Sequence, residues 1–381
     1  MIYLDNCATT YPKPVSVRAA VAQAFEKFGA NSGRSGYKMS MDTSQKIFEC
    51  REKLSDMFNA GNPENVVFTL NCTHALNMAI KGLVHYGDHV IISNLEHNAV
   101  ARPVETLAGR NYISYSVAQY DRDEDVTVEN FRRLINKRTT TIICMHASNV
   151  FGVVFPVEKL GRLAKAHGLN FIVDAAQTAG VVPIDMQKAN ITALCMPGHK
   201  GLYGPMGTGV MITSSGEKMQ TVIEGGTGSA SSSLEQPDFM PDRFESGTEN
   251  TGGIIGLSSG IDFIASKGFM KIQKHEYHIT DMLHEICSRN KNVKLYLPRP
   301  ELNFSMPILS FNFKEYSSEK TAALLSEQGI AVRAGYHCAY TAHKAFHTEQ
   351  TGTVRVCPSV FTKESDVAAF EKALKTLGTA D

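Results

Sequence analysis

Lys200 is the residue with the most chemistry to offer, and it ends the run Met-Pro-Gly-His-Lys at residues 196–200. Upstream of it, the apolar run at residues 171–173 leads directly into Asp174. A lysine amine can form a Schiff base with the aldehyde of pyridoxal phosphate (PLP), and a buried carboxylate can keep the ring nitrogen protonated. Singly, each residue has a simpler interpretation, Lys200 as a solvated surface lysine and Asp174 as a turn residue. Together they predict a PLP enzyme.

The elements that must position these two residues form an alternating pattern. From about residue 60, short β-branched runs alternate with helical apolar spacing, which is typical of parallel βαβ units. The predicted strands are residues 66–68, 89–93, 112–116, 141–145, 170–174, 193–196 and 209–213. The predicted helices between them are residues 75–84, 100–108, 128–136 and 157–167. Ligands of such a sheet bind at the carboxyl ends of its strands.

Further polar side chains follow these strands and are expected at the same edge. Thr73 and His74 begin a predicted helix, whose first amides lack partners and can bind phosphate. Thr73 could equally be an ordinary N-cap. His97 would place an imidazole where a flat cofactor ring could stack on it. Asn149 and Gln177 carry amides that could donate to the phenolic oxygen of the ring or, for Asn149, to a substrate carboxylate.

A second set of candidates lies near the C-terminus. Cys338 stands beside His337 and close to Arg333, and positive neighbours lower the pKa of a thiol and raise its thiolate fraction. A buried, inert cysteine is the usual alternative, and we accept it for the other cysteines. Arg355 ends a short β-branched run and could bind an α-carboxylate bidentately, although a surface ion pair is the simpler role.

Composition excludes several classes of protein. Lys+Arg and Asp+Glu number 38 each, so neither nucleic acid nor a membrane surface is an expected partner. The eight cysteines include no Cys-x-x-Cys pair, and we expect no metal site. The N-terminus lacks a basic and apolar leader, and no apolar stretch approaches membrane-spanning length. We therefore expect a cytoplasmic protein with reduced thiols that acts on a small molecule.

The order of these motifs resembles a known family. The chain resembles the class V aminotransferase group of fold type I PLP enzymes in six motifs that occur in the same order. They are Thr73-His74, Glu96-His97, the Ser-Asn-Val run at 148–150, Asp174-x-x-Gln177, the Gly-His-Lys run at 198–200 and the Glu-Ser-Gly-Thr run at 245–248. Within that group, the chain looks most like the group II cysteine desulfurases and the selenocysteine lyases. The resemblance runs from the first ten residues to about residue 360.

The resemblance implies an α/β fold and a set of residue roles. The large PLP-binding domain, residues 15–255, would contain a mostly parallel seven-stranded sheet, and residues 1–14 and 256–381 would form a smaller α+β domain carrying the cysteine loop. For the cofactor ring, the resemblance implies a Schiff base at Lys200, a pyridinium partner in Asp174, ring stacking by His97 and a bond from Gln177 to the phenolic oxygen. For the phosphate, it implies contacts from Thr73, His74 and His199, and a contact from Thr248 to the phosphate in the neighbouring subunit of a homodimer. It also implies substrate contacts from Arg34 and Arg355.

The implied reaction converts L-cysteine into L-alanine and leaves the sulfur on Cys338 as a persulfide for a sulfur-acceptor protein. His97 would act as acid or base for the departing sulfur. One alternative is a selenocysteine lyase or another class V lyase or aminotransferase, for which Cys338 would be dispensable. Another is a non-catalytic regulatory or assembly module. The acceptor, the preference between cysteine and selenocysteine, and a hypothetical role of Cys357 in receiving or competing for sulfur stay open at this point.

Overall fold

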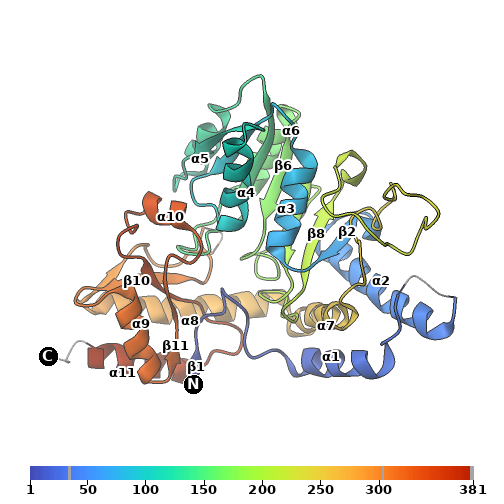
Figure 1. The fold of residues 1–381 in the computed structure, drawn as a ribbon. Coiled ribbons are helices and arrows are strands. Elements are labelled where there is room, and N and C mark those ends of the chain that lie inside the picture. Colours follow the sequence, from blue (N-terminus) through green and yellow to red (C-terminus); the bar gives the residue numbers. More distant parts are fainter. Residues whose placement is uncertain (33–35, 303, 378–381) are drawn as a thin grey trace.

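The computed structural model describes residues 1–32, 36–302 and 304–377. Its centre is a seven-stranded sheet with the order β2-β8-β7-β6-β5-β3-β4 (Figure 1). Strand β8 runs antiparallel to both β2 and β7, and the pairings among β7, β6, β5, β3 and β4 are parallel. The strands are β2 (Val66–Thr69), β3 (His89–Ser93), β4 (Ser114–Ala118), β5 (Thr139–Met145), β6 (Asn170–Asp174), β7 (Ala193–Pro197) and β8 (Gly209–Thr213).

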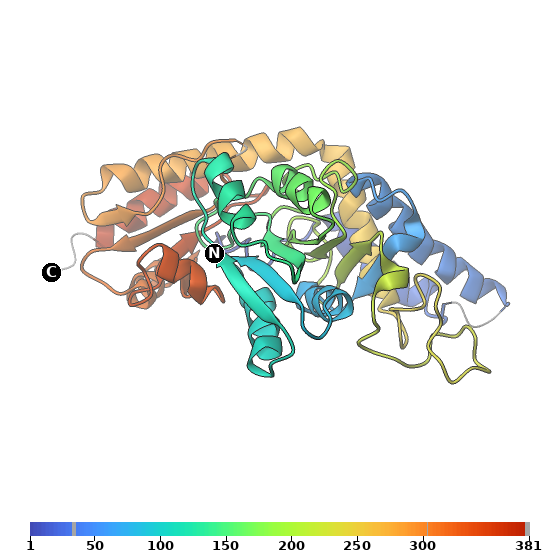
Figure 2. The same cartoon turned by 90° about the horizontal axis from the view of Figure 1, so that it is seen from above.

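Helices cover both faces of this sheet (Figure 2). The helices up to the end of the sheet region are α1 (Val15–Lys27), α2 (Lys38–Phe58), α3 (Cys72–Leu83), α4 (Asn98–Gly109), α5 (Glu124–Arg132) and α6 (Val157–Ala166). Successive strand residues point to opposite faces, so Ile142 packs in one core cluster with α2 and α6, while Ile143 packs in another with α3 and α4. This two-sided burial explains why β3, β7 and β8 are apolar runs without alternation.

The C-terminal part forms a second layer of structure. Its antiparallel sheet has the order β12-β13-β10-β9. The elements are α7 (Thr251–Lys267), α8 (Phe269–Arg289), β9 (Val293–Leu295), β10 (Leu309–Phe313), α9 (Ser318–Glu327), β11 (Ile330–Ala331), β12 (Arg333–Gly335), α10 (Tyr340–Ala345), β13 (Thr353–Val356) and α11 (Glu364–Leu377). Strand β1 (Ile2–Tyr3) pairs in parallel with β11, so the N-terminal arm lies against this part.

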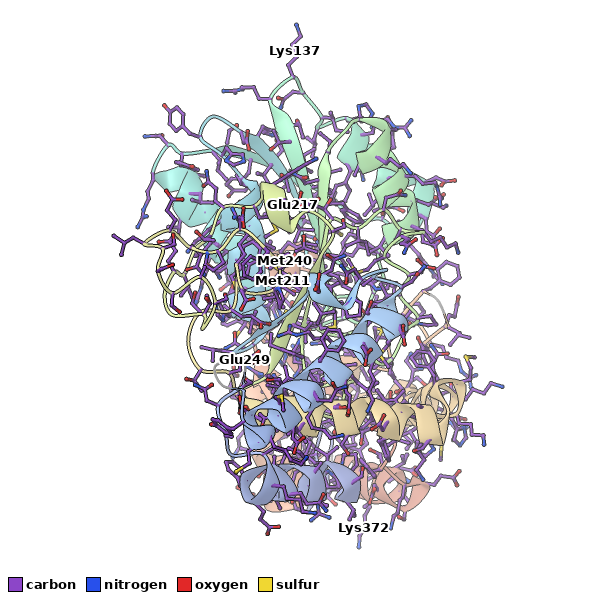
Figure 3. All side chains as sticks on the ribbon, turned by 90° about the vertical axis from the view of Figure 1, so that its right-hand side faces the viewer. Lys137, Met211, Glu217, Met240, Glu249 and Lys372 are labelled. Atoms are coloured by element: carbon purple, nitrogen blue, oxygen red, sulfur yellow. The ribbon has the colours of Figure 1, made fainter. Side chains whose placement is uncertain are left out.

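The predicted fold class is confirmed, and all seven predicted strands are present, although β4 begins at Ser114 rather than at residue 112. Helices α1 and α2 were not predicted. The domain boundary near residue 255 stays a prediction, and that position falls inside α7. Figure 3 shows Lys137 and Lys372 pointing into solvent at opposite ends of the molecule, whereas Met211 lies within it.

Candidate active site

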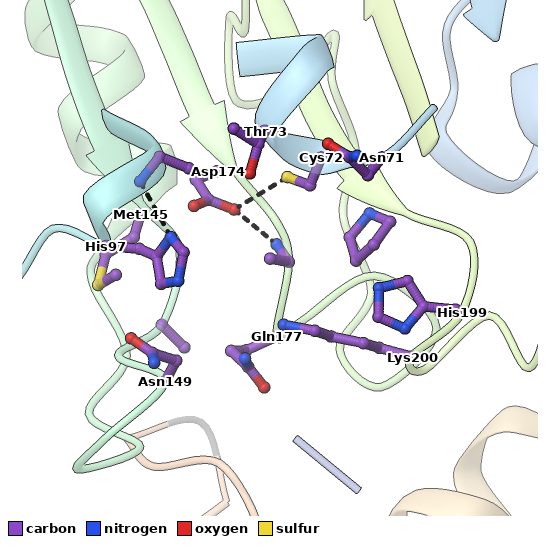
Figure 4. Close-up of a pocket in the computed structure, with 14 residues that line it drawn as sticks. Asn71, Cys72, Thr73, His97, Met145, Asn149, Asp174, Gln177, His199 and Lys200 are labelled. Carbon is purple, nitrogen blue, oxygen red and sulfur yellow. Dashed lines mark hydrogen bonds between the residues drawn. The ribbon is translucent and has the colours of Figure 1, made fainter. Parts of the chain in front are cut away.

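A pocket opens where the parallel strands end, as expected for this sheet (Figure 4). Seven predicted residues line it, namely Thr73, His97, Asn149, Asp174, Gln177, His199 and Lys200. Asn71, Cys72, Met145 and Pro197 also line the pocket and were not among the predicted site residues. The sequence prediction therefore brought together residues from the ends of five different strands, β2, β3, β5, β6 and β7.

Lys200 sits on a tight turn after β7. Gly198 begins this turn, and a Cβ atom there would lie 2.2 Å from Thr208 Oγ1, so only glycine fits. The turn is fixed by Tyr203 N, which donates to Lys200 O at 2.8 Å, and by Thr10 Oγ1, which donates to the same oxygen at 2.8 Å. Burial lowers the pKa of the Lys200 amine below its usual range. A neutral, nucleophilic amine is therefore easier to form there than on the surface.

Asp174 is the last residue of β6 and its side chain is buried. Its Oδ1 accepts hydrogen bonds from Ala176 N at 2.8 Å and from the Cys72 thiol at 3.6 Å. Burial raises the pKa of this carboxyl, and the Ala176 amide, the Lys200 charge and the Cys72 thiol oppose that rise. The carboxyl therefore lies in an apolar setting in which a cationic partner would be strongly favoured.

His97 is the N-cap of α4, and its Nδ1 accepts from Ala99 N at 3.0 Å. Because Nδ1 is an acceptor, the neutral ring carries its proton on Nε2. Burial, together with the positive charges of Lys200, Arg333 and Arg355, lowers the pKa of His97 to about 4. The imidazole is therefore uncharged near neutral pH and has a hydrogen to donate.

The N-terminus of α3 forms another wall of the pocket. Asn71 is the N-cap, and its side chain accepts from His74 N at 2.9 Å, so Thr73 is not the cap. His199, from the lysine turn, has a buried Nδ1 without a hydrogen-bond partner among the described residues. A helix N-terminus beside an unsatisfied imidazole is suited to an anion such as a phosphate group.

Four predicted residues that the structure describes do not line this pocket, namely His74, Thr248, Cys338 and Arg355. His74 and Thr248 line a neighbouring hollow, together with residues of the loop before α7. His74 Nδ1 accepts from Leu70 N at 3.2 Å, which turns the ring away from the amides of its helix. Arg34 lies outside the described residues.

Arg355, on β13, is almost fully buried and already engaged. One of its terminal nitrogens lies 2.7 Å from Asp5 Oδ1, and the other donates to Asn149 O at 2.7 Å. Its Nε has no partner among the described residues. The guanidinium therefore links the N-terminal arm to the loop of Asn149, and it does not line the pocket that contains Lys200.

Cys338 is exposed and lies on a short loop between β12 and α10. His337 and Cys338 have φ angles of 50° and 59°, an uncommon left-handed conformation for two consecutive residues that are not glycine. Two bonds hold this loop against the pocket: Asn149 Nδ2 donates to His337 O at 2.7 Å, and Asn98 N donates to Cys338 O at 2.7 Å. The thiol is therefore carried close to the residues that line the pocket.

The positive charge near this thiol comes from Arg333, whose guanidinium lies 4.0 Å from Cys338 Sγ. The expected contribution of His337 is wrong. Burial lowers the pKa of His337 to about 2, so its ring is neutral, and its Nε2 pairs with Thr353 O at 3.0 Å. The His337 ring stacks on His343, with centroids 5.9 Å apart, and thereby anchors the loop.

Most of the other contacts could not be predicted from the sequence. Asn71 could have been recognised as the N-cap from its position before a helical run. Cys72, Asp5 and Asn98 contact Asp174, Arg355 and Cys338 O respectively, and no local sequence pattern predicts these contacts. Within the described part of the chain, no cluster of His, Cys, Asp or Glu has the arrangement of a metal site. No helix among the described residues is both long and apolar enough to cross a membrane.

Comparisons with known proteins agree with this geometry. The family model "Aminotransferase class-V" matches residues 2–370. A probable cysteine desulfurase from Methanothermobacter thermautotrophicus is 33% identical over 99% of this chain and 94% of its own length. A cysteine desulfurase from Escherichia coli is 30% identical over 89% of this chain and 84% of its own length.

Solved structures are similar over nearly the whole chain. The apo structure of a cysteine desulfurase from Thermococcus onnurineus has a TM-score of 0.91 and 30% identity, and the match covers 99% of this chain and 94% of that one. A cysteine desulfurase from Escherichia coli, solved in an S-sulfonic acid form, has a TM-score of 0.87 and 27% identity, covering 98% and 94%.

Proposed function

Because the chain belongs to the class V aminotransferase family and, within it, to the cysteine desulfurases, we propose that it converts L-cysteine into L-alanine and holds the sulfur on Cys338 as a persulfide. The observation that carries this proposal is a pair of hydrogen bonds to the main chain of His337 and Cys338, one from the Asn149 side chain and one from Asn98 N. They fix an exposed thiol next to a pocket that contains a buried lysine and a buried aspartate.

Enzymes of this family use PLP, and the residues of the pocket fit that group. The buried Asp174 carboxyl suits a protonated ring nitrogen, and the unsatisfied His199 Nδ1 at the start of α3 suits the phosphate. Lys200, Asp174, Gln177, His97, Thr73 and His199 would hold it. When bound, PLP supplies an aldehyde for a Schiff base and a ring that accepts the electrons released at the substrate Cα.

In this proposal, Lys200 removes the proton from the substrate Cα. The lowered pKa of its amine supports the role, because a neutral amine can accept that proton near neutral pH. The turn bonds from Tyr203 and Thr10 to Lys200 O hold the residue while its side chain moves between the two tasks of binding and proton transfer.

Sulfur transfer uses Cys338 and His97. The Cys338 thiolate attacks the substrate sulfur, a sulfur–sulfur bond forms, and the bond from that sulfur to Cβ breaks. His97 Nε2, which carries a proton in the neutral ring, supplies the acid that the departing fragment needs. Alanine is then released, and the terminal sulfur passes to a thiol of an acceptor protein.

Arg355 is the candidate for the substrate carboxylate, with Asn149 as a second donor. Its buried Nε lacks a partner among the described residues, which leaves one donor of the guanidinium to be satisfied by a ligand. Asp5 would hold the guanidinium in place, as its 2.7 Å contact does in the structure. Arg34 stays a proposal from the family resemblance.

We also propose a homodimer located in the cytoplasm. Thr248 and His74 line a hollow beside the pocket rather than the pocket itself, which supports a contact from Thr248 to the phosphate group bound by a second copy of the chain. The cytoplasmic location is a proposal from the sequence, which favours a compartment that keeps thiols reduced.

The experiment that tests the function compares two substrates. Wild-type protein and the Cys338→Ala variant are each supplied with L-cysteine and with L-selenocysteine, and alanine is measured. A desulfurase loses alanine formation from L-cysteine in the variant, whereas the control Cys287→Ala, which changes a buried thiol of α8, keeps it. Undiminished alanine formation from L-cysteine by Cys338→Ala would overturn the proposal in favour of a lyase that needs no nucleophilic cysteine.

A further inference from the structure

Two cysteines from opposite ends of the chain lie together behind the active-site pocket. Cys7 and Cys357 belong to one small buried cluster, and their residues are 4% and 7% exposed. The backbone brings them together, because Asp5 forms a parallel bridge with Cys357. Cys357 N donates to Leu4 O at 2.7 Å, and Asn6 N donates to Cys357 O at 3.2 Å.

The environments of these two thiols shift their pKa values in opposite directions. Burial raises the pKa of Cys357 well above its usual range, and its hydrogen bond to Cys7 raises it further. Burial also acts to raise the pKa of Cys7, but the hydrogen bond from Cys357 and the positive charges of Arg355 and Lys200 outweigh it, so the pKa of Cys7 is lowered. The two thiols are therefore close enough to share a hydrogen bond, as the two sulfurs of a nucleophilic and resolving pair must be.

The pair borders the active site. Ala147 belongs to the same buried cluster and also lines the pocket of Lys200. Gln177, another residue of the pocket wall, donates from Nε2 to Cys7 O at 3.3 Å. Residues of the pocket wall therefore pack in the cluster of Cys7 and bond to its main chain. Neither thiol has a task in the proposed desulfurase reaction.

We propose that Cys7 and Cys357 form a dithiol–disulfide site that is oxidised by small hydroperoxides. The Cys7 thiolate attacks one peroxide oxygen, the oxygen–oxygen bond breaks, and water or an alcohol leaves with the proton of the medium. The Cys357 thiol then attacks the sulfenic sulfur of Cys7, a disulfide forms, and a second molecule leaves as water. The two thiols lose two electrons, and the peroxide gains them.

A second pair of neighbouring thiols provides an internal control. Cys72 and Cys195 are close enough for their charges to interact, and both border Asp174. Burial and the negative charge of Asp174 raise the pKa of both thiols, so neither has thiolate character. Under the proposal, peroxide cross-links Cys7 to Cys357 and spares Cys72 and Cys195.

The test uses holoenzyme of the Cys338→Ala variant, because the exposed Cys338 would otherwise react first. The protein is treated with a modest excess of hydrogen peroxide, alkylated and digested. The expected result is a loss of two hydrogen atoms in the intact mass, a peptide containing Cys7 joined to one containing Cys357, and full reversal by dithiothreitol. Cross-linking should be roughly tenfold faster than any change at Cys195.

A further measurement is the thermal unfolding midpoint. The disulfide would attach the N-terminal arm to the end of β13, so oxidised Cys338→Ala protein should unfold at a higher temperature than the reduced form. The Cys7→Ala/Cys338→Ala protein should show no difference in unfolding temperature after peroxide treatment. If this double variant does not fold, Cys357→Ala/Cys338→Ala replaces it as the control. The proposal is overturned if Cys7 and Cys357 stay unmodified, gain oxygen separately, or pair with other cysteines.

Discussion

The side-chain amide of Asn149 donates a hydrogen bond of 2.7 Å to the main-chain oxygen of His337, the residue before Cys338. The main-chain oxygen of Asn149 also accepts a hydrogen bond of 2.7 Å from Arg355 Nη1. One residue at the end of the central sheet therefore connects the pocket, the cysteine loop and a buried arginine. The bond matters because His337 and Cys338 hold a left-handed conformation that an isolated loop would leave.

We expect Asn149→Ala to slow sulfur transfer to Cys338 about fivefold, since one buried hydrogen bond contributes about 1 kcal/mol to holding the loop. The measurement is the rate of persulfide formation in a single turnover. Asn130→Ala, which removes a similar amide-to-backbone bond on the surface, is the matched control and should have no effect. An unchanged rate in Asn149→Ala would show that the loop is held by other contacts.

Lys200→Ala should remove both the absorption band near the visible edge and at least about a thousandfold of the alanine-forming rate. Both losses follow from the absence of the amine that binds the cofactor and moves the substrate proton. Absorption spectra and alanine formation are the measurements. Lys81→Ala, on the exposed side of α3, should leave both unchanged. A variant that keeps the band would place the covalent link elsewhere.

Arg355→Lys should raise KM for L-cysteine by about tenfold or more and change kcat less, because an ammonium group cannot hold Asp5, Asn149 O and a carboxylate together. Steady-state kinetics measure the two constants separately. The surface variant Arg122→Lys, whose partner is Glu301, should behave as wild type. If Arg355→Lys only lowers the unfolding temperature, Arg355 has a structural task.

Glu276 gives a prediction for stability against pH. It is buried and accepts from Tyr203 OH at 3.3 Å. Burial raises the pKa of Glu276 from 4.5 to about 8, and the Tyr203 bond opposes that rise only partly. Between those two values, the folded state binds more protons than the unfolded state, so the contribution to stability is complete below pH 4.5 and is lost as pH rises to about 8.

The unfolding free energy of wild type minus that of Glu276→Gln should therefore fall across this window, by up to about 1.4 kcal/mol per pH unit. Denaturant titrations of both proteins at several pH values measure this difference, and subtraction removes the contributions of all other groups. Parallel curves for the two proteins would mean that Glu276 is ionised in the folded state.

The central sheet could be predicted from the sequence because its strands are buried on both faces and read as apolar, β-branched runs. Helix α2 could not, since its buried face includes Ser40, Thr43, Arg51 and Ser55, which hide the apolar period. The buried Arg51 pairs with Glu245 at 2.5 Å and with Glu249 at 3.1 Å, and both pairings depend on the fold.

The site likewise contains residues whose meeting could be predicted from the sequence and residues whose contacts depend on the fold. Lys200, Asp174 and His97 follow strands, so their meeting at one edge follows from the topology of a parallel sheet. The Asp5–Arg355 pair and the contact of Cys7 with Cys357 join segments from opposite ends of the chain, and no local pattern predicts them. The neutrality of His337 also could not be foreseen, because it results from burial.

The most direct test of the account is the mass of each cysteine-containing peptide after one turnover with L-cysteine in the absence of an acceptor. The account predicts that the mass of one sulfur atom is added to the peptide of Cys338 and that one molecule of alanine is released for each persulfide formed. Sulfur on another cysteine, or alanine released without any protein-bound sulfur, would contradict it.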